Sequence, residues 1–335
     1  MKFFILLLVF ISTLFGDKIL RIASYNVENL FDLKKDGYEY KEYIPNTKSL
    51  WNSRNYKIKL NNTARVIKDI NADIISLEEI ESLKALKDLR YVLKNKGLYY
   101  PYYKIADKKN TTTKVAILSK IPFAYNKEIY VGYSYKYRNI LETKFKIKNT
   151  SFYIFTNHWK AKSGAESMRI KSAKALMKRV QELGLSKNII ILGDFNSDYE
   201  EYIKFKKKRR LNDTNGYTGI NHILHTNIQK TKASKVIYNK KAFYNLWYDI
   251  DEEDRYTYIF KGKKEALDSI IVSQSLLKKN QMHYIDGSFS ALTKKYLFYK
   301  KYINRWYISR GRTKKHKGKG YSDHLPIMTK FLIKF

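Results

Sequence analysis

Residues able to do chemistry stand at the end of an apolar run in the middle of the chain. Residues 189–192 are Ile, Ile, Ile and Leu, and they are followed by Gly193, Asp194, Phe195 and Asn196. An apolar run bounded by a glycine predicts a strand buried on both faces, so the polar pair lies at the rim of a core. Asp194 and Asn196 project the same way, and each carries an oxygen that can hold a reacting group or a metal-bound water. Taken alone, the segment fits a polar turn equally well.

Other apolar runs end in polar side chains of the same kind. These side chains are Asn26, Glu79, His158, Asp268, and Asp323 with His324. Strand ends of this kind can converge on one edge of a sheet. Carboxylates and an amide suit a hard divalent cation such as Mg²⁺, Mn²⁺ or Ca²⁺, and the absence of cysteine disfavours a thiolate site. Histidines are well placed to move protons near neutral pH, so the set predicts metal-assisted acid–base chemistry.

Each of these residues also has a simpler interpretation. His158 precedes Trp159 and fits a packed histidine at the edge of the core. Glu79 fits a solvated acidic cluster with its neighbours, and Asp268 fits an ion pair with a nearby lysine. The coincidence of all of them at strand ends favours one shared site.

Hydrophobic spacing predicts the elements that carry these side chains. Apolar residues three or four apart predict helices over 56–70, 82–96 and 165–183. Alternating or continuous apolar runs predict strands at 19–27, 72–77, 114–119, 140–147, 151–157, 189–192, 256–260 and 267–272, with a last strand after residue 327. No repeat and no Pro- or Ser-rich linker interrupts the pattern, so we expect one large α/β domain over residues 17–335.

The N-terminus has the layout of an export signal. Residues 1–16 carry one lysine and then an apolar run, which is shorter than the roughly 20 residues that a membrane span needs. We therefore expect a signal peptide over 1–16 and a mature chain that is secreted or periplasmic; an uncleaved anchor is the alternative. With no cysteine in the chain, disulfides cannot hold the exported protein together.

The charge balance favours a polyanionic partner. The formal net charge is +35, from 66 Lys and Arg against 31 Asp and Glu, and basic residues cluster at 204–210 and 294–319. The second segment contains 11 Lys and Arg and no acid, interleaved with Tyr and Trp. We expect nucleic acid as the partner. The alternatives are an anionic membrane surface, with Tyr296, Phe298 and Trp306 entering lipid, and a compositional bias of the whole chain.

Six motifs resemble one known family. They are SYNVENL, SLEEIE, NHWKAKSG, ILGDFNS, LDSIIVS and YSDHLPI, and they lie within residues 21–327 in the order found in the endonuclease/exonuclease/phosphatase superfamily. The resemblance implies a DNase I-like fold, a four-layer α-β-β-α sandwich of mixed α/β (α+β) class. NHWKAKSG and RYTYIFKG make the chain most similar to bacterial secreted deoxyribonucleases.

The resemblance also implies a metal site and its neighbours. Glu79 corresponds to the principal ligand of a divalent cation, most often Mg²⁺, with Asn26 and Asp323 close to the ion or its waters. Arg138 falls where related nucleases place a phosphate-binding arginine. The sequence departs from the family at Glu78, where glutamine is usual, and this acid either shifts metal affinity or points to solvent.

The remaining roles implied by the resemblance concern proton transfer. His324 with Asp268 corresponds to the dyad that handles the attacking water, and His158 to the histidine that contacts the scissile phosphate or protonates the leaving oxygen. Asp194 and Asn196 correspond to the groups that position water and phosphate.

Together these observations lead us to expect a metal-dependent endonuclease acting on DNA, with RNA as a second substrate and no obligate protein partner. The alternatives are a sphingomyelinase or phospholipase C-like enzyme on the same fold, and an inactive nucleic-acid-binding protein.

Overall fold

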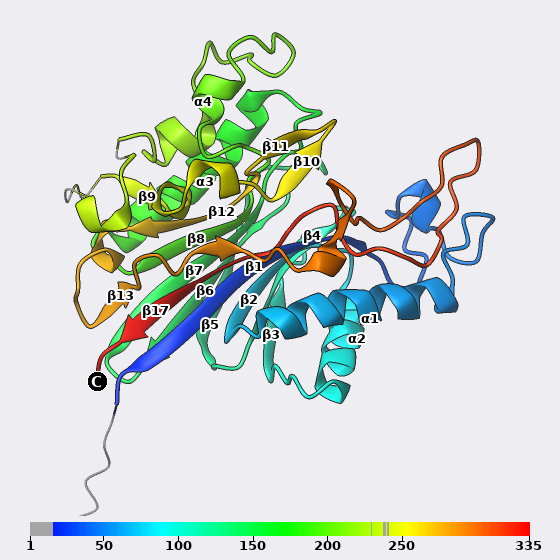
Figure 1. The fold of residues 1–335 in the computed structure, drawn as a ribbon, viewed down its shortest axis with the longest axis horizontal. Coiled ribbons are helices and arrows are strands. Elements are labelled where there is room, and N and C mark those ends of the chain that lie inside the picture. The colour runs from blue at the N-terminus through cyan, green and yellow to red at the C-terminus, as the bar shows by residue number, and fades with distance from the viewer. Residues whose placement is uncertain (1–15, 229, 237–238, 240) are drawn as a thin grey trace, which may run out of the picture.

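Two β-sheets packed face to face form the centre of the molecule (Figure 1). The computed structural model describes residues 16–228, 230–236, 239 and 241–335. The first sheet has the order β13-β17-β1-β2-β4-β3, with β14 also pairing with β17. Its strands are β1 (Lys18–Leu30), β2 (Ile74–Ile80), β3 (Tyr102–Ile105), β4 (Lys114–Ser119), β13 (Met282–Tyr284), β14 (Ser290–Ala291) and β17 (Ile327–Ile333).

The second sheet has the order β5-β6-β7-β8-β12-β9. Its strands are β5 (Phe123–Ile129), β6 (Ile140–Ile147), β7 (Thr150–His158), β8 (Ile189–Asp194), β9 (Phe243–Asn245) and β12 (Asp268–Ser273). Two short hairpins lie outside the sheets, formed by β10 (Tyr258–Phe260) with β11 (Lys263–Glu265) and by β15 (Phe298–Tyr299) with β16 (Tyr302–Ile303).

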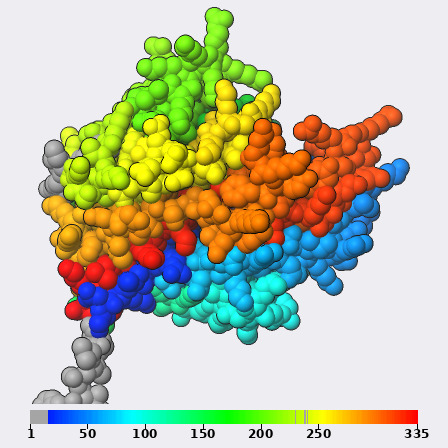
Figure 2. All heavy atoms as spheres, in the orientation of Figure 1, coloured from blue at the N-terminus to red at the C-terminus, as the bar shows by residue number. Residues whose placement is uncertain are grey.

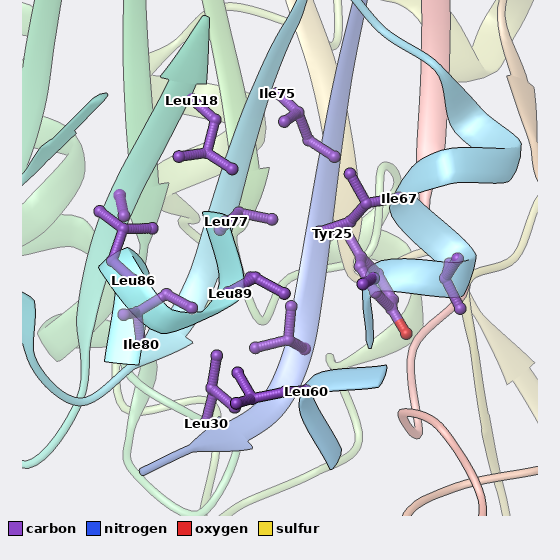
Figure 3. Packing of buried hydrophobic residues seen from close by; sticks show 14 of the residues in the cluster. Tyr25, Leu30, Leu60, Ile67, Ile75, Leu77, Ile80, Leu86, Leu89 and Leu118 are labelled. Carbon is purple, nitrogen blue, oxygen red and sulfur yellow. The ribbon is translucent and has the colours of Figure 1, made fainter. Parts of the chain in front are cut away.

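Helices cover the outer faces of both sheets. Helices α1 (Ser53–Ile70) and α2 (Leu83–Asn95) pack on the first sheet, and α3 (Glu166–Leu183) packs on the second; α4 (Glu201–Lys204) is a single turn. In Figure 3, Leu60 and Ile67 of α1 and Leu86 and Leu89 of α2 point toward strand residues such as Leu77. These apolar residues recur at helical spacing, which is why one face of each helix is buried.

A separate apolar layer lies between the two sheets. Ile22, Ile74 and Ile117 of the first sheet join one buried cluster with Ile154 and Leu192 of the second. Strands β1, β2, β7 and β8 therefore have both faces covered, one by the other sheet and one by helices. The four-layer α-β-β-α architecture predicted by the family resemblance is confirmed.

The basic segment 294–319 is partly a core element. Trp306 is 1% exposed, and Leu297 and Ile303 pack in the same cluster as α1 and α2. Tyr296 donates a hydrogen bond to Asp69 on α1. Figure 2 shows this segment, in orange, lying against the blue N-terminal part of the chain. The alternative in which Trp306 enters lipid is wrong for this residue, because its ring is buried in the core; for the same reason Trp306 is not free to stack on bases.

The predicted signal peptide falls on residues 1–16, of which only Gly16 is described. Within the described part of the chain, none of the helices combines the length and apolar character required to cross a bilayer.

Candidate active site

Two β-bulges aim the side chains of Asn26 and Glu79 at the edge of the first sheet. The pairing of β1 with β2 shifts after Asn26, and Glu79 adopts a left-handed backbone with φ 64°. Bulges and left-handed non-glycine residues are typical of sites where a side chain is re-aimed. The Asn26 amide donates to Glu79 Oε1 at 3.2 Å and to Asp194 Oδ2 at 3.0 Å. Asn26 thus links the acidic ends of both sheets.

A close approach of β7 and β8 places Asp194 beside His158. Gly193 has φ 130°, and a Cβ there would lie 2.0 Å from the backbone oxygen of Asn157. Only glycine therefore permits this pairing. His158 Nε2 lies 3.5 Å from Asp194 Oδ2, and Asn196 donates to Asp194 through its backbone nitrogen at 2.8 Å and its side chain at 3.1 Å.

His324 and Asp268 form a buried pair across the two sheets. His324 Nδ1 lies 2.7 Å from Asp268 Oδ2, and the hydroxyl of Thr257 donates to the same oxygen. Asp268 is the register partner of Asp194 on β8, so the pair stands next to the Asp194 carboxylate. The alternative pairing of Asp268 with Lys263 or Lys264 is not found.

The pKa values of the two histidines, His158 and His324, are shifted in opposite directions. Burial opposes the charged form of His324, but the carboxylates of Asp268 and Asp194 raise its pKa well above the usual range. Burial, reinforced by the positive charges of Arg138 and His324, lowers the pKa of His158 well below its usual range. His324 therefore has the stronger proton affinity, and His158 is neutral.

Glu78 is inside the protein and does not point to solvent. Its side chain has no exposed surface, and Ser24 Oγ donates to its Oε1 at 2.8 Å. Burial, together with the charge of Asp268, raises the pKa of Glu78 well above the usual range. A protonated carboxyl group here is a neutral polar group, as the amide of a glutamine would be.

A cavity of about 900 Å³ opens over these residues. Glu79, His158, Asp194, Asn196, Asp323, His324 and Arg138 all line it. Arg138 is held by Thr113, whose backbone oxygen and hydroxyl accept from Nε and Nη2 at 3.1 Å each. The structure therefore brings every predicted site residue to one place. Asn26 and Asp268 do not line the cavity but hydrogen-bond to residues that do, Asn26 to Glu79 and Asp194, and Asp268 to His324.

The acidic groups at this site suit a divalent cation. Ligand atoms of Glu79, His158 and Asp194 lie within 4.8 Å of one another. Burial and the charge of Asp323 raise the pKa of Glu79, and burial raises the pKa of Asp194 to about 7. Carboxylates crowded in this way are stabilised in the charged form by a bound cation. Oxygen donors predominate, which suits a hard metal ion.

Two charged residues of the site were not predicted. Arg305 donates to Glu28 Oε1 through Nε at 2.9 Å, and its Nη2 lies 3.1 Å from Asp323 Oδ2. Burial raises the pKa of Glu28 to about 7 despite the opposing charge of Arg305. Glu28 lies inside the motif SYNVENL, which could have drawn attention to it, whereas Arg305 is one of many basic residues in its segment.

Comparisons with known proteins identify the family. The model of the endonuclease/exonuclease/phosphatase family matches residues 21–333. The chain belongs to this family. Nucleases and phosphatases both break phosphoester bonds, so family membership supports a phosphoester hydrolase.

Solved structures show the same fold at low sequence identity. An endonuclease/exonuclease/phosphatase family protein from Bacteroides thetaiotaomicron is 17% identical with a TM-score of 0.57, covering 96% of this chain and 100% of that one. TDP2 from D. rerio, solved with a single-strand DNA product, is 15% identical with a TM-score of 0.57, covering 94% and 99%. A mannosyl-6-phosphatase from Bacteroides thetaiotaomicron is 16% identical with a TM-score of 0.55, covering 93% and 99%. No curated protein matches the chain in sequence.

Proposed function

We propose that this protein hydrolyses phosphodiester bonds of nucleic acid, with DNA as the favoured substrate and Mg²⁺ as the cofactor. The observation that carries the proposal is the His324–Asp268 pair, whose imidazole lines the same cavity as Glu79. A general base next to a carboxylate that suits a cation is what attack of water on a phosphodiester requires.

Four side chains of the site handle proton transfer and phosphate binding in this proposal. His324 takes the proton of the attacking water, and Asp268 orients the imidazole and raises its basicity. Neutral His158 and cationic Arg138 contact the phosphate, and His158 donates a hydrogen bond toward the leaving oxygen.

A second group of residues holds the ion and the reacting water. Glu79 would hold the cation, with Asp323 lining the same cavity and Asn26 hydrogen-bonded to Glu79, and the ion when bound would supply Lewis-acid stabilisation of the phosphate. Asp194 and Asn196, which hydrogen-bond each other, keep the water in line with the phosphorus.

The basic rim of the cavity supports a nucleic acid as the substrate. Lys208, Arg209, Arg210, Lys261 and Lys263 line the cavity together with the site residues. Such a set neutralises several backbone phosphates, whereas a phosphomonoester or a single lipid head group needs fewer cations. The DNA product carried by the similar TDP2 structure agrees with this choice. Because residues 1–16 have the layout expected of an export signal, the proposal places the enzyme outside the cytoplasm, as a secreted or periplasmic deoxyribonuclease.

The test is a substrate panel with and without EDTA. The mature chain is incubated with plasmid, single-stranded DNA, RNA, sphingomyelin and mannose 6-phosphate in the presence of Mg²⁺. We expect cleavage of nucleic acid that EDTA abolishes and that His324→Ala lacks. Hydrolysis of sphingomyelin or mannose 6-phosphate without nucleic-acid cleavage would overturn the proposal, and binding of DNA without any hydrolysis would indicate an inactive binding protein.

A further inference from the structure

The β10–β11 hairpin presents one of its faces to the cavity. Its register pairs Tyr258 with Glu265 and Phe260 with Lys263. Paired residues share a face of a hairpin, and all four of these residues line the cavity. Lys264 lies on the other face, where its Nζ donates to the backbone of Glu253. The hairpin therefore has a cavity side and an outer side, each carrying a lysine.

Aromatic rings on the cavity side form a path from the floor to the rim. The ring of Tyr258 lies 5.0 Å from the imidazole of His324, and the ring of Phe260 lies 6.5 Å from Tyr258 at an interplanar angle of 12°. Phe260 is 54% exposed, which is unusual for a phenylalanine. A flat apolar surface that begins at the general base suits the bases next to a scissile phosphate.

The loop 208–211 forms a second wall, and one ion pair joins it to the hairpin. Glu265 Oε1 lies 3.9 Å from Lys208 Nζ and 3.0 Å from Lys162 Nζ, and Lys162 also pairs with Glu201 at 2.9 Å. Glu265 therefore links the hairpin to the loop 208–211. Their exposed cations, Arg209 and Arg210 on the loop and Lys261 and Lys263 on the hairpin, line the same cavity.

The reacting groups lie below these walls. Asp194 is 1% exposed and His324 is 6% exposed, whereas Phe260 and Lys208 stand out at the rim. A duplex presents its phosphates on a stiff rod with its bases stacked inside, so reaching the floor would require deformation of the helix. A single strand bends freely and offers its unstacked bases to aromatic side chains.

We infer that the cavity face of the β10–β11 hairpin and the loop 208–211 bind a single strand of nucleic acid, with Phe260 stacking on a base and Arg209 and Arg210 holding phosphates. Unpaired strands are then the preferred substrate over duplexes. This inference rests on the proposed function and adds the form of the substrate.

The first experiment compares substrates on the mature wild-type protein. Cleavage rates are measured with Mg²⁺ on a single-stranded DNA oligonucleotide, a single-stranded RNA of the same sequence, a blunt DNA duplex and bis(4-nitrophenyl) phosphate. We expect kcat/KM on the unpaired oligonucleotides to exceed that on the duplex by roughly tenfold or more, because the duplex must open or deform first. The DNA and RNA arms show which backbone the site prefers.

The second experiment uses paired variants. Phe260→Ala, and separately the double variant Arg209→Ala with Arg210→Ala, should lower kcat/KM on single strands by about tenfold, as expected when a base stack or phosphate contacts are lost. The rate with bis(4-nitrophenyl) phosphate should fall by much less than the rate with single strands, because this small substrate lacks the flanking base and phosphates that these residues would hold. Lys264→Ala on the outer face should behave as wild type. Lys206→Ala with Lys207→Ala removes the same charge from the same basic run, outside the residues that line the cavity, and should lower kcat/KM by much less than the arginine variant.

Binding measured in EDTA gives a readout that does not depend on catalysis. Fluorescence anisotropy of a labelled single strand should show weaker binding for both variants and a smaller salt dependence for the arginine variant. Equal cleavage of duplex and single strand, or variants that bind single strands as wild type does, would overturn this inference and leave the proposed nuclease activity intact. Hydrolysis of bis(4-nitrophenyl) phosphate without cleavage or binding of any nucleic acid would overturn both.

Discussion

Asp268 and His324 lie 56 residues apart in the chain, and the carboxylate of the first is 2.7 Å from Nδ1 of the second. The carboxylate raises the pKa of His324 well above its usual range, despite the opposing effect of burial. His324 accepts a proton only when neutral, so activity falls as the pH drops below this raised pKa.

Replacing Asp268 with Asn should move the acid limb of the pH–rate profile. The pKa of His324 falls when the carboxylate charge is removed, so the acid limb shifts to lower pH, while the plateau rate drops by about 10²–10⁴ because the imidazole is a weaker and misoriented base. Steady-state rates on bis(4-nitrophenyl) phosphate across the neutral range measure both effects. Thr257→Ser keeps the hydroxyl that donates to Asp268 and should leave the limb in place. An unmoved limb in Asp268→Asn would contradict the role of His324 as base.

Glu79→Gln should weaken metal binding. The variant keeps the size of the side chain but loses the charge that attracts a divalent cation, so affinity for Mn²⁺ should fall by more than about tenfold. Calorimetric titration measures the affinity directly. In the wild type, a cation at about 100 times its Kd should stabilise the fold by roughly 2.7 kcal/mol, and this gain should shrink in the variant. The exposed Glu182→Gln serves as control; equal affinity in all three proteins would place the metal elsewhere.

Glu78→Gln should alter the pH dependence of stability. The folded-state pKa of Glu78 is raised, so its contribution to stability is fully present below the unfolded pKa and is lost as the pH rises through the folded pKa. The glutamine variant does not titrate, so its Tm should fall less than that of wild type as the pH is raised above neutrality. Thermal unfolding over this range, with activity as a second readout, checks the prediction. Parallel Tm curves for the two proteins would mean that Glu78 is already charged in the fold.

Gly193→Ala should prevent the close contact of β7 and β8. Its Cβ would lie 2.0 Å from the backbone oxygen of Asn157, so we expect a loss of about 3 kcal/mol or more in unfolding free energy, or failure to fold. Gly184 also has a positive φ, of 96°, but no atom lies within 4 Å of its Cβ position. Gly184→Ala should therefore cost only about 1 kcal/mol. Chemical denaturation of both variants tests the difference, and similar losses would show that φ alone matters.

Local patterns predicted the main elements well. Strands β4 and β6 occupy the ranges 114–119 and 140–147 expected from their apolar runs, and α3 ends at Leu183 before Gly184 as expected. Strand β5 (Phe123–Ile129) was missed because it is a half-exposed edge strand without clean alternation. Strands β9 and β13 were missed because three residues are too few to show a period.

Tertiary packing decided which aromatic residues and which acids are buried and which are exposed to the cavity. Trp306 and Phe260 both lie in basic, aromatic surroundings in the sequence, yet one closes the core and the other is 54% exposed at the rim of the cavity. Glu78 and Glu79 are adjacent, but the bulge in β2 buries the first beside Ser24 and turns the second toward the cavity. Neither the difference in burial between the two aromatic residues nor that between the two glutamates can be predicted from the residue types and their neighbours in the sequence.

The sequence by itself determined the types of reacting groups and their places at strand ends, because apolar runs and the polar residues that stop them are local features. Only the tertiary structure decided which of these groups meet, as Asn26 and Asp194 do at 3.0 Å across 168 residues. That distance depends on the packing of two sheets, on a bulge in β1 and on the missing Cβ of Gly193. These contacts join segments that are far apart in the sequence, so no local pattern of residues predicts them.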